Sequence, residues 1–228
     1  LGPPNGLEVT CTKDGRVFTP ENIAQYDLFV FYTTGDLTQP GTDKQPPMAP
    51  EMKEALLSAI HEGKPFVGIH TATDTFHNSR EVDPYIAMVG GEFYSHGRQQ
   101  VARMRVASPR FPGCEGLGEG FDLNDEWYTF KNLANDLHVV LVQETQGMDG
   151  WQYSRPAFPA TWARMHGKGR VFYTSMGHRE DVWTNPVFQK VLLGGIDWAL
   201  GRRDADVTPT VEQVTPGYRE LPKAPASR

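Results

Sequence analysis

The feature that most constrains the fold is a strand–helix–strand pattern in the first third of the chain. Two short apolar runs, Tyr26–Tyr32 and Pro65–Ile69, are bounded by turn-forming residues and predict strands buried on both faces. Between them lie a Pro-, Gly- and Asp-rich loop, Thr33–Pro50, and a segment with apolar residues at helical spacing, Glu51–Glu62, which ends at Gly63. Because such a helix crosses over a sheet, the pattern predicts a βαβ unit and a parallel sheet.

The remaining sequence predicts further strands and a closing helix. Residues 101–107 alternate between apolar and polar side chains, which indicates a half-exposed strand at a sheet edge. His138–Gln143 and Gly169–Ser175 indicate two more strands, and residues 187–199 have the pattern of an amphipathic helix. The chain is therefore expected to form an α/β fold.

Length and composition limit the class of protein. A chain of 228 residues favours one domain, over residues 1–203, with an extended tail over residues 204–228. Cys11 and Cys114 are too few for a disulfide framework and lack metal-ligand spacing. A net charge of -6 gives no overall attraction for nucleic acid or for anionic membranes, so neither is expected as a partner.

The sequence also bears on location. No apolar run approaches the roughly 20 residues that span a bilayer, and the first residues lack a signal-peptide pattern. We expect a soluble protein. Because a cleaved signal leaves no trace, the cytoplasm, the periplasm and secretion all stay open, and a homo-oligomer is compatible with the sequence.

Four segments place histidines or carboxylates where a strand ends or a Gly-rich turn bends. His70 and His178 each follow a predicted strand, and ligands of open α/β sheets bind beyond the carboxyl ends of the strands. The structural alternatives are histidines that only tie down turns and an acidic pair that only caps a helix. The segments are 68–74, 90–97, 122–128 and 169–180, and residues 122–128 are expected to form a loop.

These segments carry a resemblance to a known family. GIHTATD (68–74), GGEFYSHG (90–97), DEWY (125–128) and the block Pro159–His178, in this order and with Trp-Ala-Leu ending at Leu200, resemble the ThuA-like (trehalose-utilisation) family. The resemblance implies a flavodoxin-like, class I glutamine amidotransferase-like parallel sheet flanked by helices, with some antiparallel edge strands. It also implies a role in sugar metabolism.

The sequence departs from that pattern at its start. A domain of this family would open with a strand, a His-containing loop and a helix before Glu8. Leu1–Val9 resembles the end of that helix and the start of a second strand. Since a central strand cannot be omitted without leaving unpaired backbone, we expect further residues ahead of Leu1.

The resemblance also bears on glutamine hydrolysis. An amidotransferase carries a nucleophilic Cys at the position of His70, and His178 and Glu180 resemble the other two members of its triad. Thr71 and Thr73 are poor substitutes for a thiol. Glutamine hydrolysis is therefore disfavoured.

A metal site is the leading hypothesis for this pocket. Imidazoles and a carboxylate that converge would suit Zn, Mn, Co, Ni or Fe(II) and leave positions for substrate or water. A metal-free site that hydrogen-bonds a polyol is the competing interpretation. The candidate ligands are His70, His96, Glu126 and His178.

The reaction class follows from the resemblance, because trehalose-utilisation proteins act on keto-disaccharides. For a small-molecule carbohydrate with a 3-keto group, a metal-stabilised enediolate would lead to isomerisation, or to elimination or hydrolysis at the anomeric carbon. Asp74 or Asp125 is the expected base, with His96 in reserve. The candidate substrate-binding residues are Tyr94, Arg98, Trp127, Tyr128, Trp162 and Arg179.

Two other functions stay open at this point. One is a non-catalytic carbohydrate-binding or regulatory domain that has lost the amidotransferase nucleophile. The other is a metal-independent hydrolase that uses His178 and Glu180 around a bound water.

Overall fold

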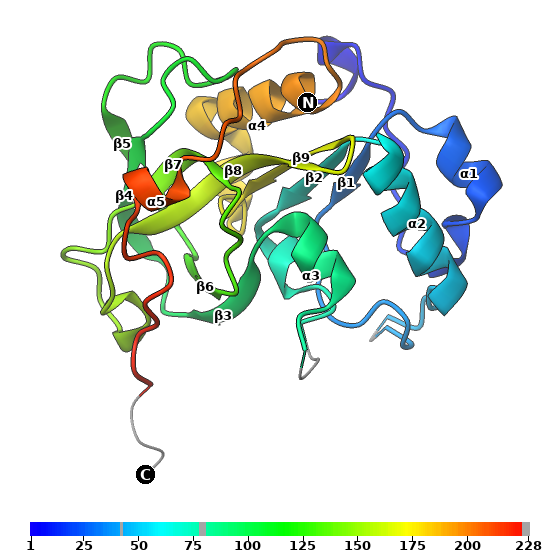
Figure 1. The fold of residues 1–228 in the computed structure, drawn as a ribbon, viewed down its shortest axis with the longest axis horizontal. Coiled ribbons are helices and arrows are strands. Elements are labelled where there is room, and N and C mark those ends of the chain that lie inside the picture. Colours follow the sequence, from blue (N-terminus) through cyan, green and yellow to red (C-terminus); the bar gives the residue numbers. More distant parts are fainter. Residues whose placement is uncertain (42, 78–80, 225–228) are drawn as a thin grey trace.

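A seven-stranded mixed sheet forms the centre of the molecule (Figure 1). The computed structural model describes residues 1–41, 43–77 and 81–224. The order of strands in the sheet is β1-β2-β9-β8-β7-β4-β5, and β3 and β6 form a separate two-stranded ribbon. The strands are β1 (Phe29–Phe31), β2 (Phe66–Ile69), β3 (Glu92–His96), β4 (Gln100–Val106), β5 (Gly120–Asp125), β6 (Tyr128–Lys131), β7 (His138–Gln143), β8 (Phe158–His166) and β9 (Gly169–Thr174).

Helices cover both faces of this sheet. The helix α4 packs on β2 and β9 from one side, and α2 and α3 pack on β9 from the other (Figure 1). In the described part of the chain, no helix is both long and apolar enough to cross a bilayer. The α-helices are α1 (Pro20–Gln25), α2 (Pro50–Glu62), α3 (Pro84–Val89), α4 (Pro186–Ala199) and α5 (Val211–Val214), and the 3-10 helices are η1 (Pro3–Asn5), η2 (Gly15–Val17), η3 (His70–Asp74), η4 (Trp151–Tyr153) and η5 (Glu180–Thr184).

The predicted βαβ unit is present. β1, β2 and β9 are parallel, with Phe31 opposite Gly68 and Ile69 opposite Thr174. Their carboxyl ends therefore meet at one edge of the sheet, and the segments that follow them lie close together. The predicted α/β class is confirmed, and the antiparallel part is larger than expected because β8, β7, β4 and β5 all pair antiparallel.

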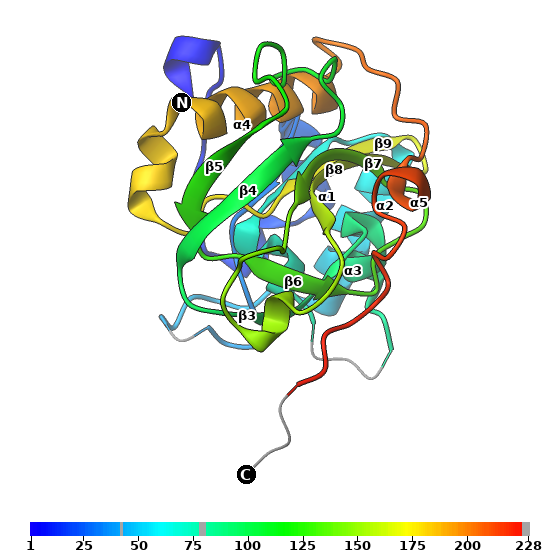
Figure 2. The same cartoon turned by 90° about the vertical axis from the view of Figure 1, so that its left-hand side faces the viewer.

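Two predictions about this antiparallel part were wrong. β4 is not at the edge, since it pairs with β7 on one side and with β5 on the other (Figure 2). Its alternating pattern comes from one solvent-exposed face and not from an open edge. Residues 122–128, expected as a loop, form the end of β5 and the start of β6.

The amino-terminal segment also differs from expectation. β1 lies at the sheet edge, and the side chains of Val30 and Tyr32 are each 47% exposed, so the strand is not buried on both faces. Leu1–Val9 contains only the short turn η1 and irregular backbone, and neither the expected helix end nor a strand forms there.

Local sequence signals explain where the long helices begin and end. The Asn185 side chain accepts hydrogen bonds from Val187 N and Phe188 N, and Pro186 occupies the first turn, so α4 begins there. α2 ends at Gly63, which has a φ of 131°. Gly195 of α4 packs directly against the Phe172 ring of β9. A Cβ added at Gly195 would lie 2.4 Å from Cε1 of that ring.

Residues 202–224, the described part of the tail, are docked on the domain. They contain α5, and Val211 and Tyr218 are buried. The Arg155 guanidinium, which stacks on Phe158, donates from Nη2 to the Tyr218 carbonyl oxygen at 2.5 Å. The tail is thus part of the packed structure.

We predict that Gly195→Ala destabilises the fold by about 1–3 kcal/mol, because the new methyl group overpacks the contact between α4 and β9. Denaturant unfolding measures the change in free energy. Lys190→Ala, an exposed substitution on the same helix, should stay within about 0.5 kcal/mol of the wild type. Equal stabilities of the three proteins would contradict the close packing.

Candidate functional site

His70 occupies a constrained turn directly after β2. It is fully buried, and its φ of 42° is one that non-glycine residues rarely adopt. Gly68 and Ala72 on either side must be small, because a Cβ on Gly68 would come within 3.0 Å of the Ala72 Cβ. The Tyr173 hydroxyl donates to the His70 carbonyl oxygen at 2.7 Å and fixes the turn. This strained strand-to-turn geometry presents one side chain at the sheet edge, as a nucleophile elbow does, but here the side chain is an imidazole.

The hydrogen bonds of His70 determine its tautomer. Nδ1 lies 2.7 Å from the Ser175 carbonyl oxygen, which can only accept, so Nδ1 carries the proton. Nε2 is therefore the ring nitrogen that faces His178 and Glu126, and it can bind a metal when it carries no proton. A histidine whose other nitrogen donates to a backbone carbonyl is the usual arrangement for a metal ligand.

His70, His178 and Glu126 form a close triangle of potential ligand atoms. His178 Nδ1 lies 3.2 Å from His70 Nε2 and 3.3 Å from Glu126 Oε1, and the third side, between His70 Nε2 and Glu126 Oε1, is 3.5 Å. Ligand atoms about 2.0–2.1 Å from a tetrahedral metal lie about 3.3–3.4 Å apart. The triangle therefore fits one face of a small divalent metal without rearrangement, and two imidazoles with one carboxylate suit Zn or Fe(II).

His96 joins the cluster from another side. Its Nδ1 lies 3.3 Å from Glu126 Oε2, the oxygen that points away from the triangle, and 3.0 Å from the Gly97 carbonyl oxygen. The four predicted ligands are thus brought together, but His96 contacts the carboxylate and is not among the three grouped ligand atoms. It orients Glu126.

The charge of Glu126 is stabilised by its neighbours. Partial burial alone would raise the pKa of this carboxyl, but the His70, His96 and His178 imidazoles together hold it below its ordinary value of 4.5. Glu126 is therefore ionised at neutral pH, as a metal ligand must be.

Asp125, predicted as a base, has a different environment from Glu126. It is fully buried, and its carboxylate accepts only backbone N–H groups: Oδ1 from Glu126 at 2.9 Å and from Arg179 at 3.0 Å, and Oδ2 from Gly177 at 2.7 Å. With its oxygens occupied in this way, Asp125 is placed to hold the backbone of the site.

Asp74, the other predicted base, is the last residue of η3, which begins at His70. Its Oδ2 accepts from the Thr34 hydroxyl, and its Oδ1 lies 2.8 Å from His77 Nδ1. The Tyr128 and His70 ring centroids lie 4.1 Å apart with the rings tilted by 39°. Burial, then the charges of Asp74 and Glu126, raise the pKa of Tyr128, so its hydroxyl is neutral.

The other predicted substrate-binding residues are scattered. Trp127 and Trp162 are fully buried and donate to backbone carbonyls of Gln100 and Val89, so neither offers a face to a ligand, in contrast to the prediction. Tyr94 packs edge-to-face on Trp151 at 6.1 Å.

The two predicted arginines also differ. Arg98 pairs with Asp149 on the surface, and both side chains are largely exposed. Arg179 pairs with Asp181 at 2.8 Å and donates to Gln99 Oε1 at 2.7 Å beside His178.

Four residues of the site were not singled out from the sequence. Tyr32 Oη and Trp183 Nε1 both donate to the Gly177 carbonyl oxygen, at 3.1 and 2.9 Å, and the two rings pack edge-to-face at 5.5 Å. The other two, Thr34 and His77, contact Asp74. Tyr32 and Thr34 follow β1. A search for polar residues directly after predicted strands, which selected His70 and His178, could therefore also have found them.

An open hollow of about 520 Å³ lies beside the cluster. It is lined by Gln99, His178, Arg179, Glu180 and Asp181, and it gives a small polar molecule access to His178. Glu180 is exposed at the start of η5.

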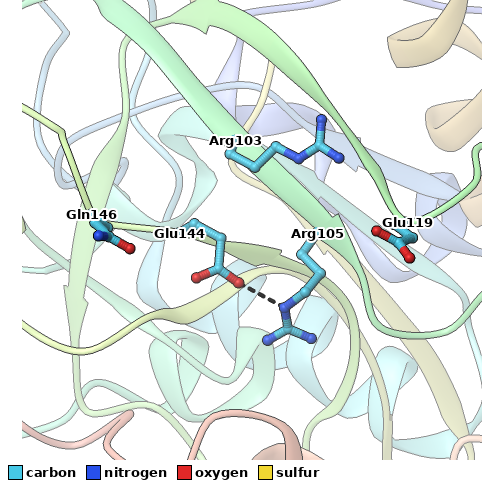
Figure 3. Close-up of a pocket in the computed structure, with 5 residues that line it drawn as sticks. All are labelled: Arg103, Arg105, Glu119, Glu144 and Gln146. Carbon is cyan, nitrogen blue, oxygen red and sulfur yellow. Dashed lines mark hydrogen bonds and ion pairs between the residues drawn. The ribbon is translucent and has the colours of Figure 1, made fainter.

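A second hollow, of about 410 Å³, lies on the antiparallel part of the sheet (Figure 3). Two of its charges are paired with each other, with Arg105 Nε at 2.6 Å from Glu144 Oε1. None of its lining residues, Arg103, Arg105, Glu119, Glu144 and Gln146, is a histidine. This hollow therefore lacks the combination of imidazoles and a carboxylate that the histidine cluster offers.

Comparisons with known proteins agree with this fold. The model of the ThuA family, described as trehalose utilisation, matches residues 1–199. A comparison with curated proteins found no match. Among solved structures, a ThuA-like protein from Bacteroides uniformis is 19% identical, with a TM-score of 0.66 over 85% of this chain and 77% of that one. A ThuA-like protein from Parabacteroides merdae is 18% identical, with a TM-score of 0.62 over 94% and 86%. At these identities the structural likeness shows the fold alone.

We predict that Glu126 makes stability depend on pH in acid. Since the folded pKa lies below 4.5, the ionised carboxylate stabilises the fold above that pH, and the contribution is lost as pH falls through the folded pKa. Denaturant unfolding of the wild type and Glu126→Gln should show a stability difference at pH 5 that narrows below about 4.5. A difference that is constant from pH 5 to strong acid would contradict this.

Proposed function

This chain belongs to the ThuA, or trehalose-utilisation, family, and from that premise we propose that it is a metal-dependent enzyme acting on keto-sugars or keto-glycosides. The reaction proposed is elimination, hydrolysis or isomerisation of a 3-keto-glycoside. The family name supports a carbohydrate substrate, and the histidine cluster supports the use of a metal.

The observation that carries the proposal is the triangle of His70 Nε2, His178 Nδ1 and Glu126 Oε1, with sides of 3.2 to 3.5 Å. The donor set fits a divalent transition metal, because one imidazole has its tautomer fixed for coordination and the carboxylate is ionised. Zn, Mn, Co, Ni and Fe(II) are the candidates.

A metal held by these residues would supply a Lewis acid that polarises a keto oxygen and makes the neighbouring C–H acidic. The protein supplies the rest. Asp74 is the proposed base, since its side chain is partly exposed, whereas Asp125 is fully buried and accepts from three backbone N–H groups. In a 3-keto-glycoside, Asp74 would take the proton from C2, and the C1–O bond would then break and release the aglycone, which gains a proton to leave as an alcohol.

Other side chains orient the substrate. The Tyr128 hydroxyl, kept neutral by burial and by the two nearby carboxylates, can donate a hydrogen bond to a sugar oxygen. The Arg179 guanidinium lines the hollow beside His178 and can bind a hydroxyl there. An imidazole at the elbow position leaves no nucleophile for acyl transfer, so glutamine hydrolysis is not proposed.

The first test is metal content. Protein purified without chelator should contain about one divalent metal per chain, and His70→Ala, His178→Ala and Glu126→Gln should each lose most of it. In each variant the affinity for the metal should fall by more than the roughly 10–100-fold that follows when a ligand loses its hydrogen-bond partner. Elemental analysis measures the metal content, and calorimetric titration with Zn²⁺ measures the affinity.

His61→Ala is the matched control, because His61 is an exposed histidine on α2 whose ring contacts only His166 among the described aromatic contacts. It should retain the full metal content. Stoichiometric metal in both histidine cluster variants would refute the assignment.

The second test is turnover of a 3-keto-glucoside with a chromogenic aglycone. The wild type should release the aglycone, and Asp74→Asn should lower kcat by about 10²–10⁴ with unchanged metal content. Asp43→Asn, an exposed carboxylate that pairs with Lys13, should behave as the wild type.

The corresponding glucoside without the keto group is the substrate control, because its C2–H is not acidified, and no release is expected. Activity that persists in chelator would support the hydrolase that uses His178 and Glu180 instead. Sugar binding without turnover or metal would support a binding domain.

A further inference from the structure

The backbone hydrogen bonds of Asp125 connect the two chain segments that supply the cluster. Asp125 is the last residue of β5, directly before Glu126, and the turn at Gly177–Arg179 follows β9 and carries His178. These strands are at different positions in the sheet, and no ladder hydrogen bond joins them. The Asp125 carboxylate accepts from the residues on both sides of His178, Gly177 N at 2.7 Å and Arg179 N at 3.0 Å.

We propose that Asp125 is a positioning residue that sets the distance between the Glu126 and His178 ligands and so determines the metal affinity of the site. This inference rests on the proposed metal site. One buried carboxylate fixes Glu126 through its own backbone N–H at 2.9 Å and fixes His178 through the flanking N–H groups.

The turn that carries His178 has few other restraints on its N–H groups. Gly177 has a φ of 113°, so the turn requires a backbone conformation that most residues avoid. The side chains of Tyr32 and Trp183 hold its carbonyl oxygen, but neither contacts an N–H of the turn. Asp125 is therefore the group that fixes the direction in which the His178 side chain leaves the backbone.

A neutral replacement of equal size separates this role from simple space filling. In Asp125→Asn, the amide oxygen can still accept from Glu126 N and Arg179 N, but the NH₂ group then faces the Gly177 N–H. Two donors cannot pair, so the turn must shift by enough to relieve the contact. The ligand triangle would open on the His178 side, whereas the bond from His70 to the Ser175 carbonyl oxygen would stay intact.

The test is calorimetric titration of Zn²⁺ into the wild type, Asp125→Asn and Asp122→Asn, together with visible absorption spectra of the Co²⁺-loaded proteins. Asp125→Asn should bind Zn²⁺ about 10–100-fold more weakly and show an altered Co²⁺ spectrum. Asp122→Asn removes the same charge from the exposed face of β5, where it pairs with Arg103 at 3.4 Å, and should match the wild type. The Co²⁺ spectrum reports the geometry of the metal ligands. If Asp125 only stabilised the fold, the folded Asp125→Asn protein would have the same Co²⁺ spectrum as the wild type.

The outcomes distinguish this inference from the proposed function. If the wild type binds no metal, the proposed function fails. If the wild type binds and Asp125→Asn binds with equal affinity and the same spectrum, the positioning role is overturned and the metal site stands.

A second measurement applies if Asp125→Asn does not fold. Amide hydrogen exchange of the wild type should show protected N–H groups at Gly177 and Arg179, with protection that rises when Zn²⁺ binds. Exchange at these two amides as fast as in an open loop, in the Zn²⁺-loaded protein, would overturn the inference.

Discussion

The hydrogen bond from His70 Nδ1 to the Ser175 carbonyl oxygen determines what the cluster can do. It joins the turns after β2 and β9, which are adjacent parallel strands, and it fixes the imidazole tautomer. The other nitrogen of the ring is then available to a ligand at the point where His178 and Glu126 meet. Without the parallel pairing, the carbonyl oxygen and the ring would not lie within hydrogen-bond distance.

Asp125 and Glu126 are neighbours in sequence with opposite environments. The end of β5 directs one side chain inward, where backbone N–H groups surround it, and the next toward three imidazoles. One carboxylate therefore binds backbone N–H groups, whereas the other faces the imidazoles. A pair of acidic residues in a sequence does not reveal this difference, because it depends on which groups of distant segments pack against each side chain.

Much of the fold followed from local patterns. The βαβ unit, the closing helix and the strands at 138–143 and 169–174 were predicted from periodicity and from turn-forming residues. β3, β5, β6 and β8 were missed, and β4 was placed at an edge, because strand preference depends on packing against neighbouring strands that the sequence does not show. Trp127 and Trp162 were expected near a ligand and are core residues, because an aromatic side chain beside a strand has the same sequence pattern in either place.

The sequence by itself determined that histidines follow parallel strands, because the carboxyl ends of such strands meet at one edge of a sheet. It also determined that no thiol stands at the elbow, since His70 occupies that position. Only the tertiary structure decided that Glu126 lies between His70, His96 and His178, and that Asp125 is occupied by backbone N–H groups. The contacts between Glu126 and the histidines join segments 30 or more residues apart, and those from Asp125 to Gly177 and Arg179 join segments more than 50 residues apart. Their distances depend on how the sheet curves and on how its turns pack.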